Sequence, residues 1–449
     1  MIDLKDLRDN PDKYRTAASQ KRIEVDIDRL LALEGERRSL DAQRQQLTAE
    51  KNAIGKQIGQ LAGQLKKATG DEKARLEAER QRLQARPTEL KAAETELDNK
   101  VTTLEPQIQE LLLRVPQPAD EDVPVGRDDS ENVEIKKWGT VRQFEFVPKS
   151  HIELGQQLGL VDFERGVKLA GSRSYVLLGD GALLHQAVLR LAQDMMIERG
   201  FVPMTVPVLV REGAMTGTGY FPLGREQAYA MSNEDPPKYL VGTAEVSLTA
   251  YHMDETFEAK DLPRKYVAMS PCFRREAGTY GKDTAGLYRI HQFDKVEQVI
   301  VCRNDIEESK QWHQAILQNA EDVLQKLNLP YRVVYVCTGD LGQGQIAKYD
   351  IETWMPSRDN WGETHSASRF YDFQARRLNM RYRDTDGRVK FCHTLNNTVV
   401  ASPRILIPIL ELYQNPDGSV SIPEALRCYM NGRERIEKDP AIRRDAPLR

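Results

Sequence analysis

A heptad repeat is the feature that most constrains how this chain can fold. Leucines and isoleucines alternate at spacings of three and four over residues 30–65, and leucines recur every seven positions over residues 76–111. A hydrophobic seam that repeats every 3.5 residues faces a partner helix. The two series are separated only by a short segment that contains Gly70. We therefore expect an antiparallel coiled-coil hairpin over about residues 27–112, roughly 60 Å long at ~1.5 Å per residue.

The residues of this hairpin predict further details. Pro87 should kink the second helix, because proline lacks an N–H and its ring collides with the preceding turn. Folding back at Gly70 should bring Arg44 close to Glu94 across the seam. A coiled coil that joins two chains is the common alternative. A hairpin, however, buries its apolar seam between its own two helices and needs no second chain. A projecting arm that contacts a different partner therefore explains the pattern equally well.

The first helix of the hairpin and its tip carry an excess of positive charge. The cations are Arg37, Arg38, Arg44, Lys51, Lys56, Lys66 and Lys67, and the acids among them are Glu36, Asp41 and Glu50. Such an excess suits phosphates. An ordinary solvated helix face has a similar composition, so charge alone does not distinguish a phosphate-binding surface from a solvated one.

Composition excludes several classes of protein. With 449 residues, of which 40% are hydrophobic and 29% charged, the chain can form two or three domains with a large core. No window reaches the ~20 apolar residues that cross a bilayer, and the N-terminus alternates acids and bases, so we expect a soluble, cytoplasmic protein. The five cysteines have no short-spaced pair, which argues against disulfides and against zinc. A net charge of −4 disfavours broad nonspecific nucleic-acid binding but allows a local basic surface.

Near residue 115 the sequence changes from a purely helical pattern to a linker and then to a mixed pattern of strands and helices. Residues 1–115 form the helical part, and residues 116–137 read as an acidic linker that contains prolines. Over residues 138–432, β-rich apolar runs alternate with amphipathic helices, which predicts an α+β domain on a mainly antiparallel sheet. Residues 433–449 are highly charged and read as a frayed tail.

Charged residues on apolar, strand-like segments mark the candidate site. No P-loop, Rossmann glycine fingerprint, zinc-protease helix or nucleophile elbow occurs in its required context. Arg274 and Glu276 should share one strand face, and a glycine-rich loop follows them. By the same alternation, the returning strand should place Arg289, His291, Phe293, Lys295 and Glu297 on one face. This surface suits a nucleotide, although an internal ladder of salt bridges would also explain any single pair.

Residues 273–297 resemble the second signature motif of class II aminoacyl-tRNA synthetases, in the version of the seryl-tRNA synthetase family. The likeness covers nearly the whole chain, because that family joins a long antiparallel coiled-coil arm to a class II catalytic domain on an antiparallel sheet. The turn at Gly200–Phe201, followed by Pro207, resembles the first motif, which lies at the dimer interface in this family. The segment from Thr394 to Arg404 resembles the third motif, although it lacks the glycines that many relatives have there.

The resemblance implies a serine–tRNA ligase. Serine and ATP would form seryl-adenylate and pyrophosphate, and the seryl group would then pass to the 3′-end of tRNA(Ser), with tRNA(Sec) left open as a second acceptor. Arg274 and Arg404 are the implied catalytic residues. The implied ATP-binding residues are Arg274, Arg275, Glu276, Arg289, Phe293, Glu363, Ser366 and Arg404.

Further roles follow from the same resemblance. The implied serine-binding residues are Thr243, Ala244, Glu245, Arg274, Glu297, Asn396 and Thr398. Glu363 and Ser366 would hold Mg²⁺ through ATP, since both offer hard oxygen ligands. His365 stands where relatives more often have serine, and we expect it behind the ligands or at the surface. The implied tRNA-binding residues are Arg37, Arg38, Arg44, Lys51 and Lys56, in a homodimer whose arm reaches the tRNA across subunits.

Three alternatives remain open at the level of sequence. The chain could activate an amino acid for a carrier other than tRNA, although relatives of that kind lack the long arm. It could be a noncatalytic RNA-binding scaffold on a decayed synthetase fold, although decay usually removes the charged residues first. It could also be a class II synthetase for another amino acid, which exchange assays with serine, threonine, alanine and glycine would separate.

Overall fold

The computed structural model describes residues 1–231, 233–278 and 285–438. The chain divides into two compact units. One comprises Met1–Ile2, Thr16–Ile23 and Pro116–Arg449, and the other comprises Asp3–Arg15 and Glu24–Val115. No helix in the described part of the chain combines the length and the apolar character that a membrane span requires.

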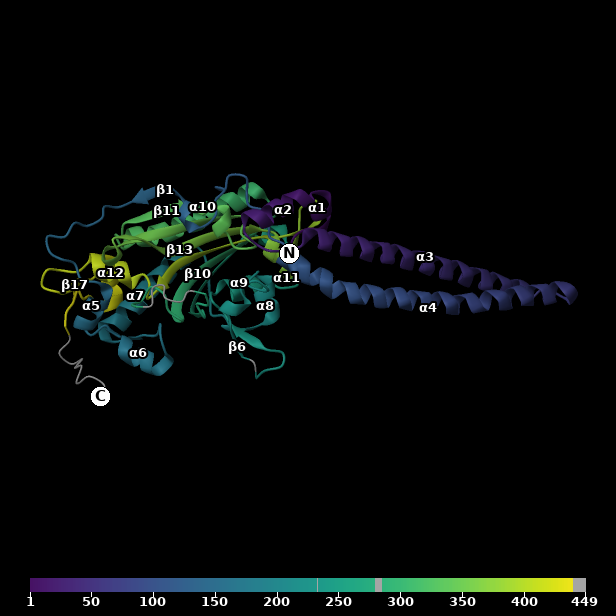
Figure 1. The fold of residues 1–449 in the computed structure, drawn as a ribbon, viewed down its shortest axis with the longest axis horizontal. Coiled ribbons are helices and arrows are strands. Elements are labelled where there is room, and N and C mark those ends of the chain that lie inside the picture. The colour runs from purple at the N-terminus through teal and green to yellow at the C-terminus, as the bar shows by residue number, and fades with distance from the viewer. Residues whose placement is uncertain (232, 279–284, 439–449) are drawn as a thin grey trace. The chain divides into compact units, whose positions relative to one another are not determined.

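The helical unit is the predicted coiled-coil hairpin. Its helices, the second of which also enters the other unit, are α1 (Leu4–Asp9), α2 (Pro11–Gln20), α3 (Ile27–Leu65) and α4 (Gly70–Arg114). Helices α3 and α4 pack against each other and lie side by side along the arm (Figure 1). The turn falls where the sequence predicts it, since Gly70 has φ +59°, a backbone conformation that favours glycine. Helix α4 continues through Pro87 as one element.

The seam of the hairpin differs from the prediction by one helical turn. Arg44 pairs with Asp98 at 3.1 Å, whereas Glu94 accepts from Lys51 at 2.5 Å and from Thr48 at 2.9 Å. The predicted Arg44–Glu94 pair is therefore wrong. The heptad pattern specifies which face of each helix is buried, but the ends of the connecting turn decide which residues lie opposite one another.

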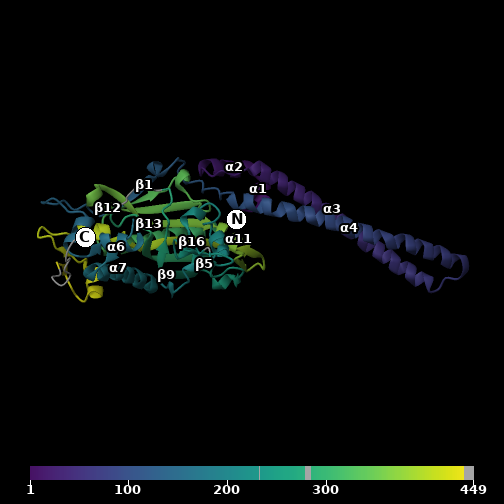
Figure 2. The ribbon, with the colours of Figure 1, turned by 60° about the horizontal axis from the view of Figure 1, so that its bottom comes forward.

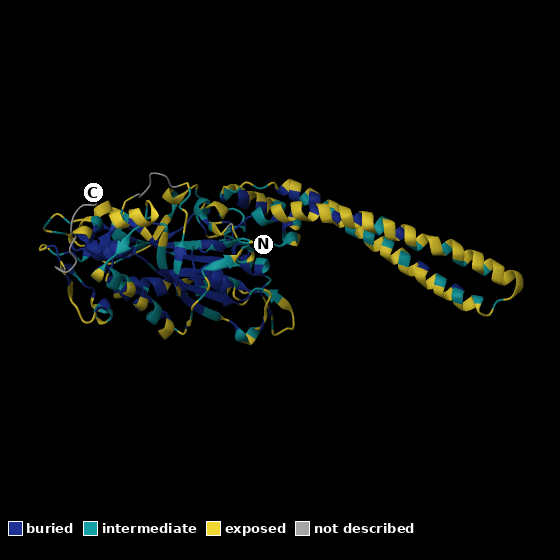
Figure 3. Cartoon of the chain, turned by 90° about the horizontal axis from the view of Figure 1, so that it is seen from below, coloured by how far each residue is buried: buried dark blue, intermediate teal, exposed yellow. Residues whose placement is uncertain are grey.

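A buried carboxylate lies at the base of the hairpin. Glu34 is 1% exposed and pairs with Arg8 at 2.8 Å and with Arg38 at 3.0 Å. Breaking a buried ion pair from one side is strongly destabilising. Arg38 therefore has a structural partner at this end, while the part of the arm nearer the tip is mostly exposed (Figure 3).

An eight-stranded sheet forms the centre of the other unit. Its order is β1-β11-β12-β13-β16-β10-β9-β4, and every pair is antiparallel except the parallel pair of β4 and β9. The bounds are β1 (Val133–Trp138), β4 (Val202–Met204), β9 (Arg264–Phe273), β10 (Gln292–Cys302), β11 (Tyr331–Tyr335), β12 (Ala347–Met355), β13 (Asn360–Tyr371) and β16 (His393–Ser402). Figure 2 shows several of these strands side by side. The mainly antiparallel α+β fold is confirmed.

Smaller elements surround this sheet. The helices are α5 (His151–Gln157), α6 (Phe163–Ala170), α7 (Gly179–Glu198), α8 (Glu212–Gly217), α9 (Glu245–Ala250), α10 (Ile306–Lys326), α11 (Phe373–Leu378), α12 (Leu406–Leu412) and α13 (Glu424–Arg427). The short strands are β2 (Val161–Asp162), β3 (Val176–Leu177), β5 (Leu209–Arg211), β6 (Tyr229–Met231), β7 (Lys238–Leu240), β8 (Thr256–Glu258), β14 (Arg381–Arg383), β15 (Val389–Phe391), β17 (Val420–Ser421) and β18 (Arg435–Ile436). The 3-10 turns are η1 (Asp129–Glu131), η2 (Arg225–Gln227), η3 (Ala259–Asp261), η4 (Thr338–Asp340), η5 (Pro356–Arg358) and η6 (Cys428–Met430).

Alternation along β10 divides the sheet into two faces. Val296 and Ile300 belong to the large core, together with Leu184 and Val188 of α7 and Ala320 of α10. Side chains at odd positions of β10 point to the opposite face, because successive residues of a strand alternate. Helices α7 and α10 thus cover one face, where Asp294 contacts His185 of α7 at 3.0 Å, and Lys295 and Glu297 are left on the other.

Two strands of the sheet unit lie partly or wholly in the segments predicted as a linker and as a tail. Residues 133–137, which lie in the predicted linker, belong to the edge strand β1, which pairs with β11. Asp120, also in that segment, accepts from Arg369. The predicted tail begins at residue 433 and includes β18, and its residues 439–449 lie outside the described part of the chain.

Candidate active site

A cavity of about 230 Å³ opens on the sheet face opposite α7 and α10. Most of the predicted site residues line it: Glu245, Arg274, Glu276, Phe293, Glu297, Glu363, Ser366, Asn396, Thr398 and Arg404. A second cavity of about 430 Å³ shares Arg274, Glu276, Glu363 and Arg404 with the first and adds Arg289. The structure thus brings together residues from six separate segments of the chain.

Three predicted residues lie outside both linings. Thr243 is 1% exposed and Ala244 is fully buried, and the hydroxyl of Thr243 accepts from the N–H of Glu245 at 3.2 Å. These two residues therefore support the start of α9 from behind. Arg275 is exposed, and its backbone N–H donates to Gln227 at 3.0 Å.

Two β-bulges allow the strands to present their polar residues on one face. On β13, Glu363 lies opposite Glu352, and Ser366 lies opposite Asp350, with Thr364 as the additional residue between them. Residues three apart on a regular strand point to opposite faces, but one bulge returns them to the same face. A second bulge on β16 at Val399 places Thr398 opposite Glu297.

The connection between β9 and β10 corrects the prediction of continuous charged strand faces. Strand β9 ends at Phe273 and β10 begins at Gln292, so Arg274, Glu276 and Arg289 lie in the connection. The N–H of Arg274 still donates to the carbonyl of His291 at 2.9 Å. Glu276, with φ +52°, turns the chain and accepts from Arg289 at 2.7 Å. Phe293, Lys295 and Glu297 share one face of β10, as predicted.

The two arginines assigned to catalysis keep their charges available. Arg274 donates to the carbonyl of Gly242 at 3.3 Å, and its guanidinium lies 5.3 Å from the ring centre of Phe293. Arg404 donates to the carbonyls of Tyr288 at 3.0 Å and of Glu363 at 2.9 Å. Within the described residues, neither arginine forms a salt bridge. Two cations that contact only neutral groups at a cavity wall make a site for an anion.

The other charges of the cavity are partly paired. Lys295 contacts Glu297 at 2.5 Å, so this pair, like Glu276 with Arg289, fits the alternative of an internal ladder of salt bridges. That alternative does not extend to Arg274 and Arg404. The charged cavity is therefore more than a set of structural ion pairs.

Glu363 is an ionised carboxylate at the cavity wall. The protein atoms around it would raise its pKa, but the positive charges of Arg404, Lys348 and Arg274 outweigh this effect and lower the pKa below its ordinary value. The neighbouring Asp350 has the opposite shift: burial raises its pKa, although Lys348 lies 3.3 Å away. The hydroxyl of Ser366 hydrogen-bonds to Asp350.

The far end of the cavity is lined by polar groups that suit an amino acid. Glu245, at the start of α9, accepts from the Tyr220 hydroxyl at 2.8 Å and from Gln374 at 2.8 Å. Burial and the nearby charge of Glu297 raise the pKa of Glu245 to about 7. Among the described residues, the buried amide nitrogen of Asn396 has no hydrogen-bond partner. The Thr398 hydroxyl lies 3.4 Å from Glu297.

The raised pKa of Glu245 predicts how the substrate-free protein responds to pH. The folded state holds the proton of Glu245 more tightly than the unfolded state does, so this residue lowers the free energy of unfolding as pH rises from its ordinary pKa of 4.5 to about 7. The cost above pH 7 is about 3 kcal/mol. Glu245→Gln removes this cost. In thermal melts, the difference in Tm between Glu245→Gln and the parent should therefore shift in favour of the variant between pH 5 and pH 8.

A matched change at an exposed carboxylate provides the control. Glu258→Gln, at the exposed end of strand β8, should melt in parallel with the parent at every pH. If Glu245→Gln also runs parallel to the parent, the protonation of Glu245 does not contribute to stability in this range.

Several cavity residues were not assigned from sequence. They are Tyr220, Tyr288, Lys295, Gln345, Thr364, His365 and Ser368. Alternation placed Lys295 on the same face as Phe293 and Glu297, but it was given no binding role. His365 is 1% exposed, so the surface position considered for it is wrong. Tyr220 and Gln345 lie on loops far from the motifs in sequence, so no sequence pattern indicated that they line the cavity.

The arm residues proposed for RNA are mostly engaged in ion pairs within the hairpin. Arg37 pairs with Asp41 at 3.1 Å, Arg44 with Asp98 and Lys51 with Glu94. Exposed pairs of this kind contribute only about 0–1 kcal/mol, so phosphates can replace the carboxylates. Lys56 is exposed and forms no salt bridge within the described residues.

Comparison with known proteins identifies the family. Residues 1–118 match the model of the seryl-tRNA synthetase N-terminal domain, and residues 229–413 match that of the tRNA synthetase class II core domain (G, H, P, S and T). The chain is 47% identical over 330 residues to a serine–tRNA ligase of Deinococcus radiodurans, which covers 74% of this chain and 77% of the relative. The chain belongs to the seryl-tRNA synthetase family. The corresponding ligase of Fervidobacterium nodosum is 48% identical over 326 residues, 73% of this chain and 76% of that one.

Solved members of the seryl-tRNA synthetase family have the same fold. The enzyme of Pyrococcus horikoshii, solved in complex with ATP, is 38% identical with a TM-score of 0.86, over 98% of this chain and 100% of the other. The cytoplasmic enzyme of Naegleria fowleri, in complex with AMP, is 29% identical with a TM-score of 0.83, over 96% of both chains. The arm and the antiparallel catalytic sheet are thus family features.

Proposed function

We propose that this member of the seryl-tRNA synthetase family activates serine with ATP and transfers the seryl group to tRNA(Ser). The observation that carries the proposal is the pair of guanidinium groups, Arg274 and Arg404, that form no salt bridge with any described residue and share one cavity with the buried carboxylates Glu245 and Glu297. The cations suit a polyphosphate, and the carboxylates suit an amino acid's ammonium and hydroxyl groups. A single cavity that binds both substrates favours a reaction between them.

In the first step, a carboxylate oxygen of serine attacks the α-phosphorus of ATP. The bond from the α-phosphorus to the bridging oxygen breaks, and pyrophosphate leaves with the electron pair. The attacking carboxylate is already ionised, so the reaction needs charge neutralisation and alignment more than a base. Arg274 stabilises the charge that develops on the α-phosphate, and Arg404 holds the γ-phosphate. Glu276 and Arg289 contact the nucleotide from the second cavity.

Adenine stacks between Phe293 and the guanidinium of Arg404 in this proposal. In the structure Arg404 lies over the ring of Tyr288 at 4.4 Å, while Phe293 is covered by Arg274. Arg274 therefore leaves the ring when the base enters and turns toward the α-phosphate. Arg275 remains a candidate for the outer part of the nucleotide, because its side chain is exposed beside the same loop.

The residues at the cavity wall fit Mg²⁺ bound through ATP. Glu363 is ionised and faces the cavity, and the bulge at Thr364 places Ser366 on the same face. Hard oxygen donors next to substrate phosphates are typical of magnesium sites. When bound, the ion neutralises phosphate charge; Glu363 and Ser366 would hold it, and Asp350 orients the Ser366 hydroxyl.

Serine selection is assigned to the opposite end of the cavity. Glu245 receives the ammonium group, with Thr243 and Ala244 supporting the turn at the start of α9. Glu297 and Thr398 hydrogen-bond the serine hydroxyl, with Asn396 beside them. A site that hydrogen-bonds a hydroxyl rejects the analogue lacking it strongly, because its own polar groups would otherwise stay buried and unpaired.

In the second step, a ribose hydroxyl at the tRNA 3′-end attacks the activated carbonyl, and AMP leaves. The arm binds the RNA through Arg37, Arg38, Arg44, Lys51 and Lys56. A long thin hairpin can lie along an RNA helix without entering its deep major groove, which protein side chains cannot read.

We further propose a homodimer that presents each arm to tRNA on the other subunit, a cytoplasmic location, and the domain limits 1–115, 116–137, 138–432 and 433–449. Charging of tRNA(Sec) would follow from the same recognition.

Serine-dependent exchange of pyrophosphate into ATP tests the proposal. Exchange should occur with serine and should be lower by about 10⁴ in kcat/KM with alanine, because alanine leaves Glu297 and Thr398 unpaired. Threonine and glycine complete the series. A scaffold would show no exchange with any of the four, and preference for another of them would reassign the substrate. Exchange without charging of tRNA would favour a different carrier.

A further inference from the structure

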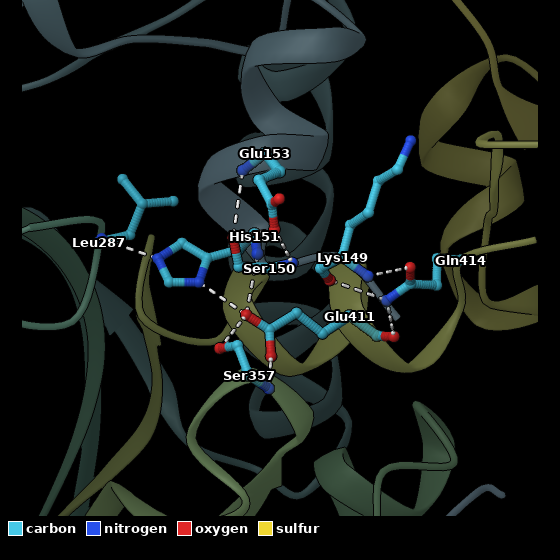
Figure 4. Close-up of polar contacts among 8 residues, drawn as sticks. All are labelled: Lys149, Ser150, His151, Glu153, Leu287, Ser357, Glu411 and Gln414. Carbon is cyan, nitrogen blue, oxygen red and sulfur yellow. Dashed lines mark hydrogen bonds and ion pairs between the residues drawn. The ribbon is translucent and has the colours of Figure 1, made fainter. Parts of the chain in front are cut away.

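A buried network joins four segments behind the nucleotide cavity. Glu411 of α12 is fully buried, and its carboxylate accepts from the Nδ1 of His151 at 2.7 Å and from the His151 backbone N–H at 2.9 Å. The same carboxylate accepts from the N–H of Ser357 at 2.8 Å and from its hydroxyl at 2.7 Å. Figure 4 shows Glu411 between these two partners.

The hydrogen bonds define the protonation of the network. Burial alone would raise the pKa of Glu411, but the hydrogen bonds from His151 and Ser357 hold it below its ordinary value, so the carboxylate is ionised. Nδ1 of His151 therefore carries the proton it donates. Nε2 is left as an acceptor, and it receives the backbone N–H of Leu287 at 3.2 Å (Figure 4).

The residue after Leu287 connects this network to the cavity. The ring of Tyr288 is covered by the guanidiniums of Arg404, at 4.4 Å, and of Arg358, at 4.2 Å. The carbonyl of Tyr288 accepts from the Nε of Arg404 at 3.0 Å. Arg358 follows Ser357, so Glu411 holds the segment that carries Arg358 directly and the backbone before Tyr288 through His151.

The close fit at Gly286 indicates that this contact is specific. A Cβ at Gly286, where φ is +79°, would lie 2.3 Å from Nε2 of His151. The ring of His151 thus reaches the backbone at the end of the loop that follows Arg274, and it contacts that backbone at Gly286 and Leu287.

We infer that His151, oriented by Glu411, is a positioning residue for ATP: it holds the backbone at Leu287 so that Tyr288 orients Arg404 toward the nucleotide. This inference rests on the proposed binding of ATP by Arg404. His151 touches no substrate and acts only through the loop. Its loss should therefore weaken ATP binding and leave the serine end of the cavity unchanged.

Two substitutions at the same position separate the two hydrogen bonds. Asparagine places an amide near Nδ1 and keeps the bond to Glu411, but it is too short to reach Leu287. Glutamine extends as far as Nε2 and keeps an acceptor for Leu287. In pyrophosphate exchange, His151→Asn should raise the KM for ATP about tenfold, the equivalent of one net hydrogen bond, and leave the KM for serine within twofold. His151→Gln should restore the KM for ATP.

Hydrogen exchange gives a readout that does not depend on activity. In the free enzyme, the amide of Leu287 should lose protection in His151→Asn and keep it in His151→Gln. Ser150→Ala is the matched control, since it removes the N-cap of the same helix without touching the loop, and it should lower Tm while leaving the KM for ATP unchanged. Gly286→Ala displaces the loop from its own side and should reproduce the effect of His151→Asn even if that variant folds poorly.

The outcomes are distinct from those that test the function. Loss of serine-dependent exchange in the parent would refute the proposed function, whatever the variants do. With the parent active, equal effects of His151→Asn and His151→Gln, a parallel rise in the KM for serine, or unchanged protection of Leu287 would each overturn the role of His151.

Discussion

Replacing Arg274 with alanine should lower kcat/KM for serine-dependent pyrophosphate exchange by about 10³. Removal of one preorganised donor to a developing oxyanion typically costs 10²–10³, and here a full positive charge beside the α-phosphate is lost as well. Arg274 is exposed and forms no ion pair with another described residue, so its removal leaves no buried charge behind. The decrease should appear largely in kcat, because the charge on the phosphate oxygens is greatest in the transition state.

Removal of an arginine at the far end of β9, the strand that precedes Arg274, provides the control. Arg264 begins β9 at the end remote from Arg274 and lines neither cavity. Arg264→Ala should retain exchange activity within about twofold, since surface changes away from a site have small effects. A loss in Arg274→Ala that appears only as a higher KM for ATP would reduce Arg274 to a binding residue.

Deletion of residues 38–96, with a short Gly-Ser turn in their place, should abolish charging of tRNA(Ser) and leave pyrophosphate exchange unchanged. The arm belongs to a different compact unit from the residues that line the cavity, so exchange should not depend on it. Charging requires the RNA to be held, and a protein that loses several phosphate contacts loses orders of magnitude in affinity. We expect a decrease of at least about 10² in kcat/KM for tRNA.

Point changes on the two helices of the arm test the assignment more finely. Lys56→Ala should raise the KM for tRNA and reduce its dependence on salt concentration, because one phosphate contact is lost. Lys91→Ala, an exposed lysine of α4 that was not assigned to RNA, is the matched control and should behave as the parent. If deletion of the arm abolishes exchange together with charging, the arm is structural.

The arm shows what a periodic sequence pattern can predict and what it cannot. The heptads predicted two antiparallel helices and a turn at Gly70, because an apolar seam at 3.5 residues faces a partner helix and the short connection lets the second helix fold back on the first. They did not predict the pairing of Arg44 with Asp98, since Arg44 lies near several acids, namely Asp41, Asp98 and Glu105. Differences among such exposed pairs are fractions of a kcal/mol, which is too little for sequence to rank.

The catalytic sheet shows a different limit. Alternation along β10 correctly placed Phe293, Lys295 and Glu297 on one face, because the period of a strand depends only on local backbone geometry. The same rule would have placed Glu363 and Ser366 on opposite faces. A bulge at Thr364 brings them together, and a bulge depends on how neighbouring strands match rather than on any one residue.

From its sequence alone, this protein could be assigned its arm, its antiparallel catalytic domain, its family and most of the charged residues of its cavity, because periodicity and motifs are properties of contiguous residues. Only the tertiary structure decided which charges remain available: Arg274 and Arg404 contact neutral groups, whereas Arg289 and Lys295 pair with glutamates. It also revealed His151 and Glu411, 260 residues apart, behind the loop of the nucleotide cavity. Pairing between distant segments depends on distances that exist only after the chain has folded.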